Sequence, residues 1–191
     1  EHTGWVIELS FSPNEPVLAS GSSDQTIRLW DVETGQCIRV LQGHTSWVST
    51  VDYSPVGNIL VSGSADQTVR FWDVCTGACI KTFHCQVGSI RTVLFSPDGH
   101  LLAVSGKSRA VQLWNLQTNN LQITLHGHID WVPAVAFLSD DTLVTGSGDC
   151  LIHVWNLHTG ELSRILAGHT EGVRSLAFDR HCNILASGGD D

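Results

Sequence analysis

Histidine, a hydroxyl residue and aspartate recur together along the chain at nearly constant spacing. The sets are His2, Ser20 and Asp24; His44, Ser62 and Asp66; His128, Thr145 and Asp149; and His169, Ser187 and Asp191. These residue types form the triad of many hydrolases, in which a carboxylate orients an imidazole that activates a hydroxyl nucleophile. The first hypothesis is therefore that these sets catalyse acyl transfer.

The repetition of the set argues against catalysis. A triad needs an exposed nucleophile beside an oxyanion pocket, and several copies of one active site within a single chain are implausible. A tryptophan follows the first three sets, at Trp30, Trp72 and Trp155, and a buried indole N–H also requires a partner. We interpret each set as a buried polar network that fixes turn geometry. We expect no catalytic residue, and because no cofactor motif occurs, no cofactor.

The tryptophans set the period of the chain. Trp30, Trp72, Trp114 and Trp155 are spaced 42, 42 and 41 residues apart, and each is followed by aspartate or asparagine. A repeat of this length accommodates about four short strands with their turns. Such a sheet cannot bury both faces alone, so the repeats must stack on one another.

Apolar residues at fixed offsets define the first strand of each repeat. They are Val6, Leu9, Phe11; Val48, Val51, Tyr53; Ile90, Val93, Phe95; Val132, Val135, Phe137; and Val173, Leu176, Phe178. The first gap is odd and the second even, so keeping all three residues on buried faces predicts a bulge between the first two. Second strands are predicted at 17–20, 59–62, 101–104, 143–145 and 184–187. Third strands are predicted at 26–30, 68–72, 110–114 and 151–155, and a fourth strand at 37–41 follows the first turn.

These repeated features resemble the WD-repeat family of β-propellers. Gly-His pairs open repeats at Gly43-His44, Gly127-His128 and Gly168-His169, with Glu1-His2 as a variant, and Ser-Pro turns and Trp-Asp endings follow in phase. The resemblance implies an all-β propeller whose four-stranded blades surround a central channel lined by the first strand of each blade. We expect repeats at about 2–42, 43–84, 85–126 and 127–167, and a truncated fifth at 168–191. A ring of about seven blades, or closure by self-association, would complete the propeller.

The third repeat departs from the pattern. It has Gln86, Val104 and Ser108 at the histidine, hydroxyl and aspartate positions, and it keeps Trp114. We expect this repeat to be locally the weakest. As an alternative, the repeat is adapted for contact, because Arg91, Lys107 and Arg109 fall near the same loops.

Composition limits the partners. The net charge is −9 and only two lysines occur, which disfavours nucleic acid and anionic membrane surfaces. No apolar run approaches the ~18 residues of a membrane span, so we expect a cytoplasmic location. The six cysteines do not have zinc-site spacing, and we expect no metal.

Function is therefore expected in surfaces. In WD-repeat proteins partners often bind the face that carries the loops between blades, and the resemblance maps this face onto Trp5, Ile7, Trp47, Ser49, Arg91, Lys107, Trp131, Pro133 and Arg174. Aromatic residues and arginine dominate binding hot spots, and the cations suit an acidic or phosphorylated peptide. The tryptophans could instead be ordinary packing between blades. We expect a non-catalytic scaffold or sensor that binds a protein or peptide; the alternative is a regulatory array that restrains a larger signalling enzyme, such as a nucleotide-dependent switch, kinase or protease.

Overall fold

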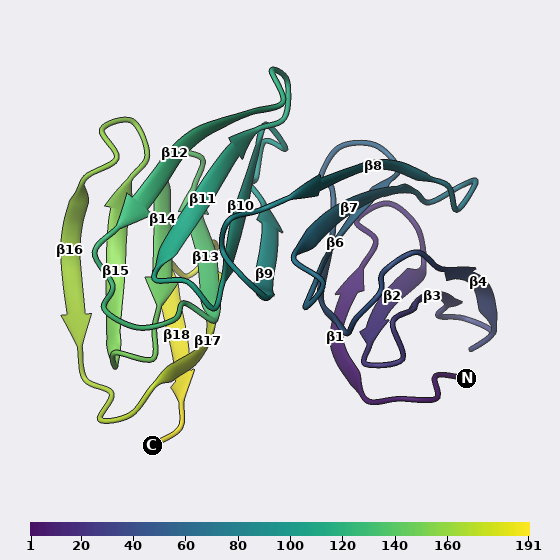
Figure 1. Ribbon diagram of the computed structural model, residues 1–191, viewed down its shortest axis with the longest axis horizontal. Helices are drawn as coiled ribbons and strands as arrows, with labels where there is room; N and C mark the ends of the chain where they lie inside the picture. The colour runs from purple at the N-terminus through teal and green to yellow at the C-terminus, as the bar shows by residue number, and fades with distance from the viewer.

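The computed structural model describes residues 1–191 as four antiparallel sheets of four strands and one sheet of two. The all-β propeller architecture predicted from the sequence is confirmed (Figure 1). Blade 1 contains β1 Val6–Phe11, β2 Val17–Ser22, β3 Ile27–Asp31 and β4 Cys37–Leu41. Blade 2 contains β5 Val48–Tyr53, β6 Ile59–Ser64, β7 Thr68–Asp73 and β8 Cys79–His84. Blade 3 contains β9 Ile90–Phe95, β10 Leu101–Gly106, β11 Ala110–Asn115 and β12 Asn120–His126. Blade 4 contains β13 Ala134–Ser139, β14 Thr142–Gly146, β15 Leu151–Asn156 and β16 Leu162–Ala167, and half-blade 5 contains β17 Val173–Asp179 and β18 Ile184–Gly189.

The residue after each tryptophan shapes the turn between the third and fourth strands. Oδ1 of Asp73 accepts hydrogen bonds from the backbone amide of Thr76 at 2.7 Å and from its hydroxyl at 2.8 Å. The turn then reverses at Gly77, whose φ of 77° is a left-handed conformation that glycine adopts without steric cost. Asp31, Asn115 and Asn156 accept the equivalent amide hydrogen bond in their own blades. The Trp-Asp ending is thus a turn signal as well as a core signal.

The odd spacing of apolar residues in the first strands produces the predicted bulge. The register shifts between Val6 and Glu8 in β1, between Val48 and Thr50 in β5, and between Val173 and Ser175 in β17. Blade 4 differs: β13 begins at Ala134, because Pro133 has no N–H to donate to a strand ladder.

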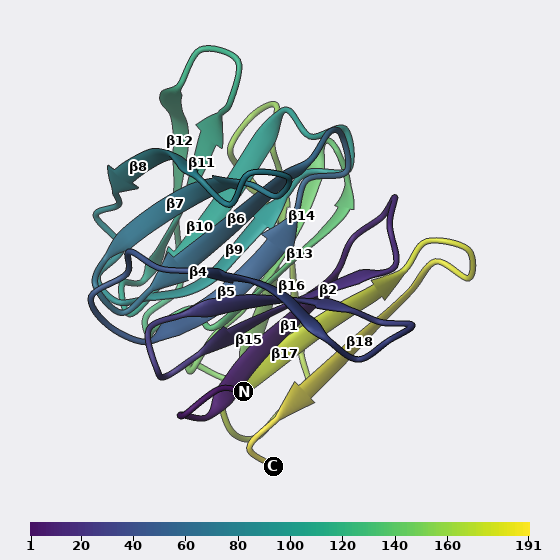
Figure 2. The same ribbon diagram turned by 90° about the vertical axis from the view of Figure 1, so that its right-hand side faces the viewer.

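The hydrophobic core lies between neighbouring blades. Val48, Val51 and Tyr53 of blade 2 are buried in one cluster with Ile27 and Leu29 of blade 1. The expectation that the equivalent residues of β1 are buried is wrong, because Leu9 is 53% exposed and Phe11 is 66% exposed. No other sheet covers this side of blade 1. Figures 1 and 2 together show β1 separated from the two-stranded sheet of β17 and β18: the strands overlap in the view of Figure 2 and lie apart in that of Figure 1.

Side chains connect the innermost strands across the blade boundaries. The Ser10 hydroxyl accepts a hydrogen bond from the Tyr53 amide at 3.3 Å. The Asp52 carboxylate accepts one from the Phe95 amide at 2.9 Å. These contacts replace the ladder that a continuous sheet would provide, and they satisfy amides at strand edges.

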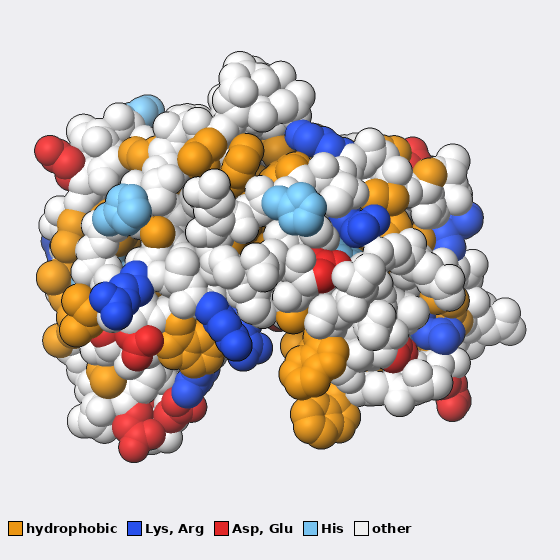
Figure 3. Space-filling view, in the orientation of Figure 1, with side chains coloured by type: hydrophobic (Ala, Val, Ile, Leu, Met, Phe, Trp, Pro, Cys, Tyr) orange, Lys and Arg blue, Asp and Glu red, His pale blue; other side chains and the backbone are white.

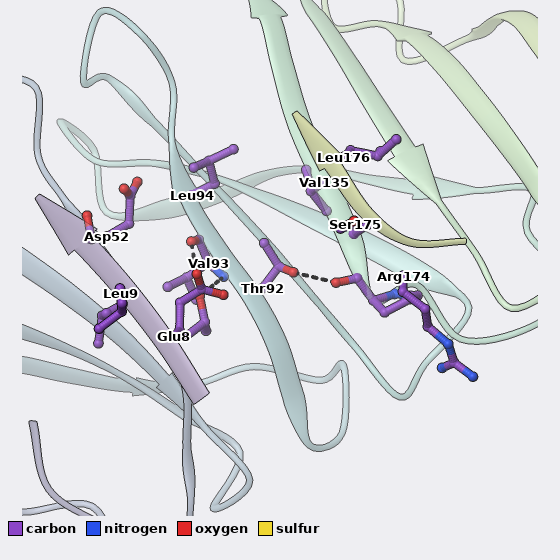
Figure 4. A pocket seen from close by; sticks show the side chains of 15 residues that line it. Glu8, Leu9, Asp52, Thr92, Val93, Leu94, Val135, Arg174, Ser175 and Leu176 are labelled. Atoms are coloured by element: carbon purple, nitrogen blue, oxygen red, sulfur yellow. Dashed lines mark hydrogen bonds between the residues drawn. The ribbon is translucent and has the colours of Figure 1, made fainter. Parts of the chain in front are cut away.

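The innermost strands of all five units line a central channel of about 290 Å³. Figure 4 shows Glu8, Asp52 and Thr92 around this space, with Arg174 toward one end. The loops between blades and the turns between second and third strands lie at one end of the channel; we call this side the loop face. Both chain termini lie on it, at the lower edge of Figure 1. The structure contains no helix that could span a membrane.

Candidate functional site

The predicted polar sets come together within blades 1, 2, 4 and 5. In blade 2, Nδ1 of His44 lies 2.9 Å from Oδ2 of Asp66, and its Nε2 lies 2.7 Å from Oγ of Ser62. The indole N–H of Trp72 donates to the same hydroxyl at 2.8 Å. The equivalent distances in blades 1 and 4 are 2.7 to 2.8 Å, for His2, Ser20, Asp24 and Trp30 and for His128, Thr145, Asp149 and Trp155. In half-blade 5, His169 contacts Asp191 at 2.7 Å and Ser187 at 2.8 Å.

Burial makes the network unsuitable for hydrolysis. The side chains of His44 and Asp66 are 1% and 6% exposed, and Ser62 is inaccessible to solvent. A nucleophile in this position cannot reach a substrate. The Ser62 hydroxyl also has two partners within the network, because it accepts from Trp72 and contacts His44. The geometry therefore fits a network that satisfies buried donors and acceptors.

The protonation states follow from these contacts. Burial acts to raise the pKa of Asp66, but hydrogen bonds from Thr68, Thr45 and His44 outweigh it and hold the pKa well below its usual range. Burial lowers the pKa of His44, against the raising effect of Asp66. We assign a neutral imidazole that donates from Nδ1 to Asp66 and accepts at Nε2 from Ser62.

Blade 3 replaces the network with apolar packing. Gln86, which the sequence places at the histidine position, is exposed, whereas Cys85 and Val87 on either side of it are buried. Val104 is also buried, and the indole N–H of Trp114 has no hydrogen-bond partner. Replacing buried ionic groups with well-packed apolar side chains is often neutral or stabilising. That this blade is locally the weakest stays a prediction.

Blade 4 adds a second histidine that sequence reasoning missed. The ring of His153 stacks on that of His128, with centroids 3.8 Å apart and planes 10° apart. His153 is buried, and neither of its ring nitrogens has a partner. Its pKa is lowered by burial first, and then by the neighbouring His128. Arg28, Arg70 and Gln112 hold this position in the other blades, so alignment of the repeats could have singled it out.

Acidification is expected to destabilise blade 4 through His153. The unfolded chain takes up a proton near the ordinary pKa of 6.5, whereas the folded protein resists uptake to a lower pH. The unfolded state therefore binds more protons as the pH falls below about 6.5, and stability decreases. We expect the melting temperature to fall between pH 7 and pH 5, and His153→Gln to reduce that fall. An equal fall in the variant, followed by circular dichroism, would show that His153 is not responsible.

The candidate partner-binding residues gather in two adjoining hollows on the loop face. The Trp47 hollow, of about 260 Å³, is lined by Ile7, Ser46, Trp47, Ser49, Ala65, Ser89, Arg91 and Lys107. The Trp131 hollow, of about 350 Å³, is lined by Ile7, Glu8, Ser49, Arg91, Thr92, Trp131, Pro133 and Arg174. Ile7, Ser49 and Arg91 belong to both. Figure 3 shows Lys and Arg side chains facing exposed hydrophobic side chains across a notch at the lower edge of the molecule.

Two guanidinium groups contact the Trp131 ring. The guanidinium carbon of Arg174 is 4.5 Å from its ring centroid, and that of Arg91 is 5.3 Å away. Arg174 also forms an ion pair with Asp190, which raises the pKa of Arg174. These two cation–π contacts hold the indole at the channel mouth.

The alternative that the tryptophans pack between blades does not hold for two of them. Trp47 is 53% exposed and Trp5 is 77% exposed. Trp5 lies outside both hollows and is the one candidate that the structure does not bring together with the others.

Two acidic residues in the channel were also missed. Burial raises the pKa of Asp52 to about 7, and the nearby charge of Glu8 adds to the effect. Burial likewise raises the pKa of Glu8. Side chains alternate along a strand, so their places next to the apolar positions of β5 and β1 were a signal for channel-facing residues.

Comparison with known proteins agrees with this architecture. The family described as WD domain, G-beta repeat matches residues 1–31, 35–73, 77–115, 119–156 and 160–191. The chain therefore belongs to the WD40 repeat family.

Curated relatives share only short segments with this chain. Eukaryotic translation initiation factor 3 subunit I of Aspergillus niger is 51% identical over 39 residues, which is 20% of this chain and 12% of that protein. Protein HIRA of Zea mays is 50% identical over 40 residues, which is 21% of this chain and 4% of that protein. Each match is about one repeat long, so the similarity is to the repeat unit.

Proposed function

We propose that this WD40 repeat domain is a non-catalytic scaffold or sensor that binds a protein partner across its loop face. The observation that carries the proposal is the convergence of eight residues selected from the sequence on two adjoining hollows. The hollows share a wall and together span the channel mouth. A single extended segment can therefore contact both.

The chemistry of the hollows favours a peptide with acidic or phosphorylated groups. Exposed tryptophan and arginine side chains are the commonest hot-spot residues. Trp47 and Trp131 offer large apolar surfaces with little side-chain entropy to lose. Arg91 and Lys107 add positive charge on the same rim. Guanidinium groups bind carboxylates and phosphates through paired hydrogen bonds.

Two further features support an intracellular assembly. All six cysteines are free in the structure, as is usual in a reducing compartment. The Aspergillus niger relative is by its name a subunit of a larger factor. On this basis we propose a cytoplasmic location and a role within a multi-protein complex.

The double variant Trp47→Ala, Trp131→Ala tests the loop face. Because both indoles are at the surface of the hollows, we expect the variant to fold normally. We expect its affinity for partners to fall by about 30-fold or more, which is the effect of one strong hot spot. Affinity capture from native extract, quantified by mass spectrometry against the wild type, measures this. Trp5→Ala is the matched control, because Trp5 is exposed on the same face outside the hollows. Full retention of every partner by the double variant would refute the proposal.

A further inference from the structure

We propose that the Trp47 hollow is a site for one phosphorylated side chain of the partner, with Arg91 and Lys107 holding the phosphate. This inference rests on the proposed function and adds the chemistry and position of the group that is recognised. It commits to a phosphorylated peptide over other phosphate-bearing molecules.

The charge of the turn between the second and third strands inverts in blade 3. The other four units have aspartate at the end of this turn, at Asp24, Asp66, Asp149 and Asp191. Blade 3 has Ser108 there, preceded by Lys107. In a chain with a net charge of −9, this turn has lost its carboxylate and gained an ammonium group. The loss of the polar network and the gain of a cationic site thus occur in the same turn.

The two cations of the hollow are free to bind a ligand. Arg91 and Lys107 are both exposed, and neither takes part in any of the ion pairs of the structure. Arg174, by contrast, is paired with Asp190. Arg91 is oriented by its contact with the Trp131 ring while its charge remains unneutralised.

Backbone hydrogen bonds hold together the two segments that carry the cations. The amide of Lys107 donates to the carbonyl oxygen of Ser89 at 3.0 Å, and the amide of Ser108 donates to that of Val87 at 2.9 Å. Ser89 lies two residues before Arg91, so the turn with Lys107 is tied to the segment with Arg91. Such preorganisation reduces the entropy lost on binding.

The pair of cations favours a phosphate over a carboxylate. A phosphorylated side chain has a charge of about −1.5 to −2 and three acceptor oxygens at neutral pH. A single carboxylate can neutralise only one of the two cations. The hollow of about 260 Å³ also has Trp47 as one wall, against which the residue beside the phosphate can pack.

A continuous polyanion is a poorer fit. Glu171, Asp190 and Asp130 all act on Arg174 at the far side of the Trp131 hollow, so the positive region ends there. A nucleic acid or an anionic membrane needs an extended basic surface. A peptide with one phosphate and neighbouring apolar residues fits the two hollows better, because they combine two unpaired cations with aromatic side chains.

Two degenerate peptide pools test the inference. One has a fixed central phosphoserine or phosphothreonine, and the other has the unmodified residue. We expect the wild-type protein to bind the phosphorylated pool at least about 10-fold more tightly, the worth of one hydrogen bond to a charged group. Arg91→Gln and Lys107→Met should each abolish this preference. Arg109→Gln, which removes the same charge two residues from Lys107 outside both hollows, should leave it intact, and thermal melts check that all variants fold.

Three results would overturn the inference. Equal binding of the two pools would show that phosphate is not recognised. A loss in Arg109→Gln as large as in Lys107→Met would show attraction to general charge. Binding of phosphatidylserine vesicles or of an oligonucleotide as tightly as the phosphorylated pool would show that the hollow does not select a phosphorylated peptide. The proposed function is judged separately by Trp47→Ala, Trp131→Ala, so it can survive any of these results.

Discussion

Replacing Asp66 with alanine is expected to lower the free energy of unfolding by about 3 kcal/mol, because the donors of four hydrogen bonds lose the carboxylate that accepts them. Its two carboxylate oxygens accept from the Thr68 amide and hydroxyl, from the Thr45 amide, and from His44. Removal of the side chain leaves the two amides and the Thr68 hydroxyl without this acceptor, and leaves His44 Nδ1 only the Thr68 hydroxyl, 3.2 Å away. The first three donors belong to a turn and a loop whose conformations depend on the carboxylate.

Ser108→Ala is the matched comparison, because Ser108 occupies the same place in blade 3. Its hydroxyl contacts only the amide and carbonyl of Ala110, at 3.3 and 3.1 Å. We expect a loss of less than about 1 kcal/mol, the net worth of one partly exposed hydrogen bond. Urea unfolding of the two variants beside the wild type measures both values. Equal losses would show that the Asp66 network contributes no more to stability than an ordinary turn contact.

The strands were predictable because the same pattern of apolar and turn residues occurs in each repeat. Predicted and observed third strands differ by at most one residue at either end: the prediction for blade 2 is Thr68 to Trp72, and β7 ends at Asp73. The polar residues that must meet were also predictable, since the spacing of His44, Ser62 and Asp66 recurs to within one residue in blades 1, 4 and 5. Repetition supplies in one sequence much of what an alignment of relatives would provide.

Features that depend on a particular neighbour were not predictable. The apolar pattern of β1 matches that of β5, yet Leu9 and Phe11 are exposed because no sheet covers them. The repeat spacing predicts Gln86 at the histidine position. In the structure Cys85 and Val87 are buried on either side of it, and Gln86 is exposed. The stacking of His153 on His128 likewise requires two strands to be placed side by side. Pattern alone gives the offset of a residue but does not give the side chains that surround it.

Gly106→Ala is expected to be the most damaging small substitution in blade 3. A Cβ at this position would lie 2.4 Å from the carbonyl oxygen of Ser89 and 2.8 Å from that of Val87. Both oxygens are backbone atoms, and both accept the hydrogen bonds that tie the turn at Lys107 to the preceding loop. Neither can retreat without losing its bond. We expect a loss of about 2 to 3 kcal/mol, at the upper end for overpacking.

The matched control is Gly168→Ala, where the added Cβ would meet no atom within 4 Å. We expect this substitution to be nearly neutral. The difference in stability between the two variants then measures the cost of the contact between the added Cβ and the two carbonyl oxygens at Gly106. The comparison also bears on binding. The two carbonyl oxygens that the added Cβ would push against accept the hydrogen bonds that hold the Lys107 turn to the segment leading to Arg91. If Gly106→Ala folds with little loss yet keeps its preference for the phosphorylated pool, the turn is compliant and preorganisation is unnecessary. If instead stability and preference fall together, while Gly168→Ala keeps both, the blade 3 turn is a rigid support for the two cations, as its backbone hydrogen bonds indicate.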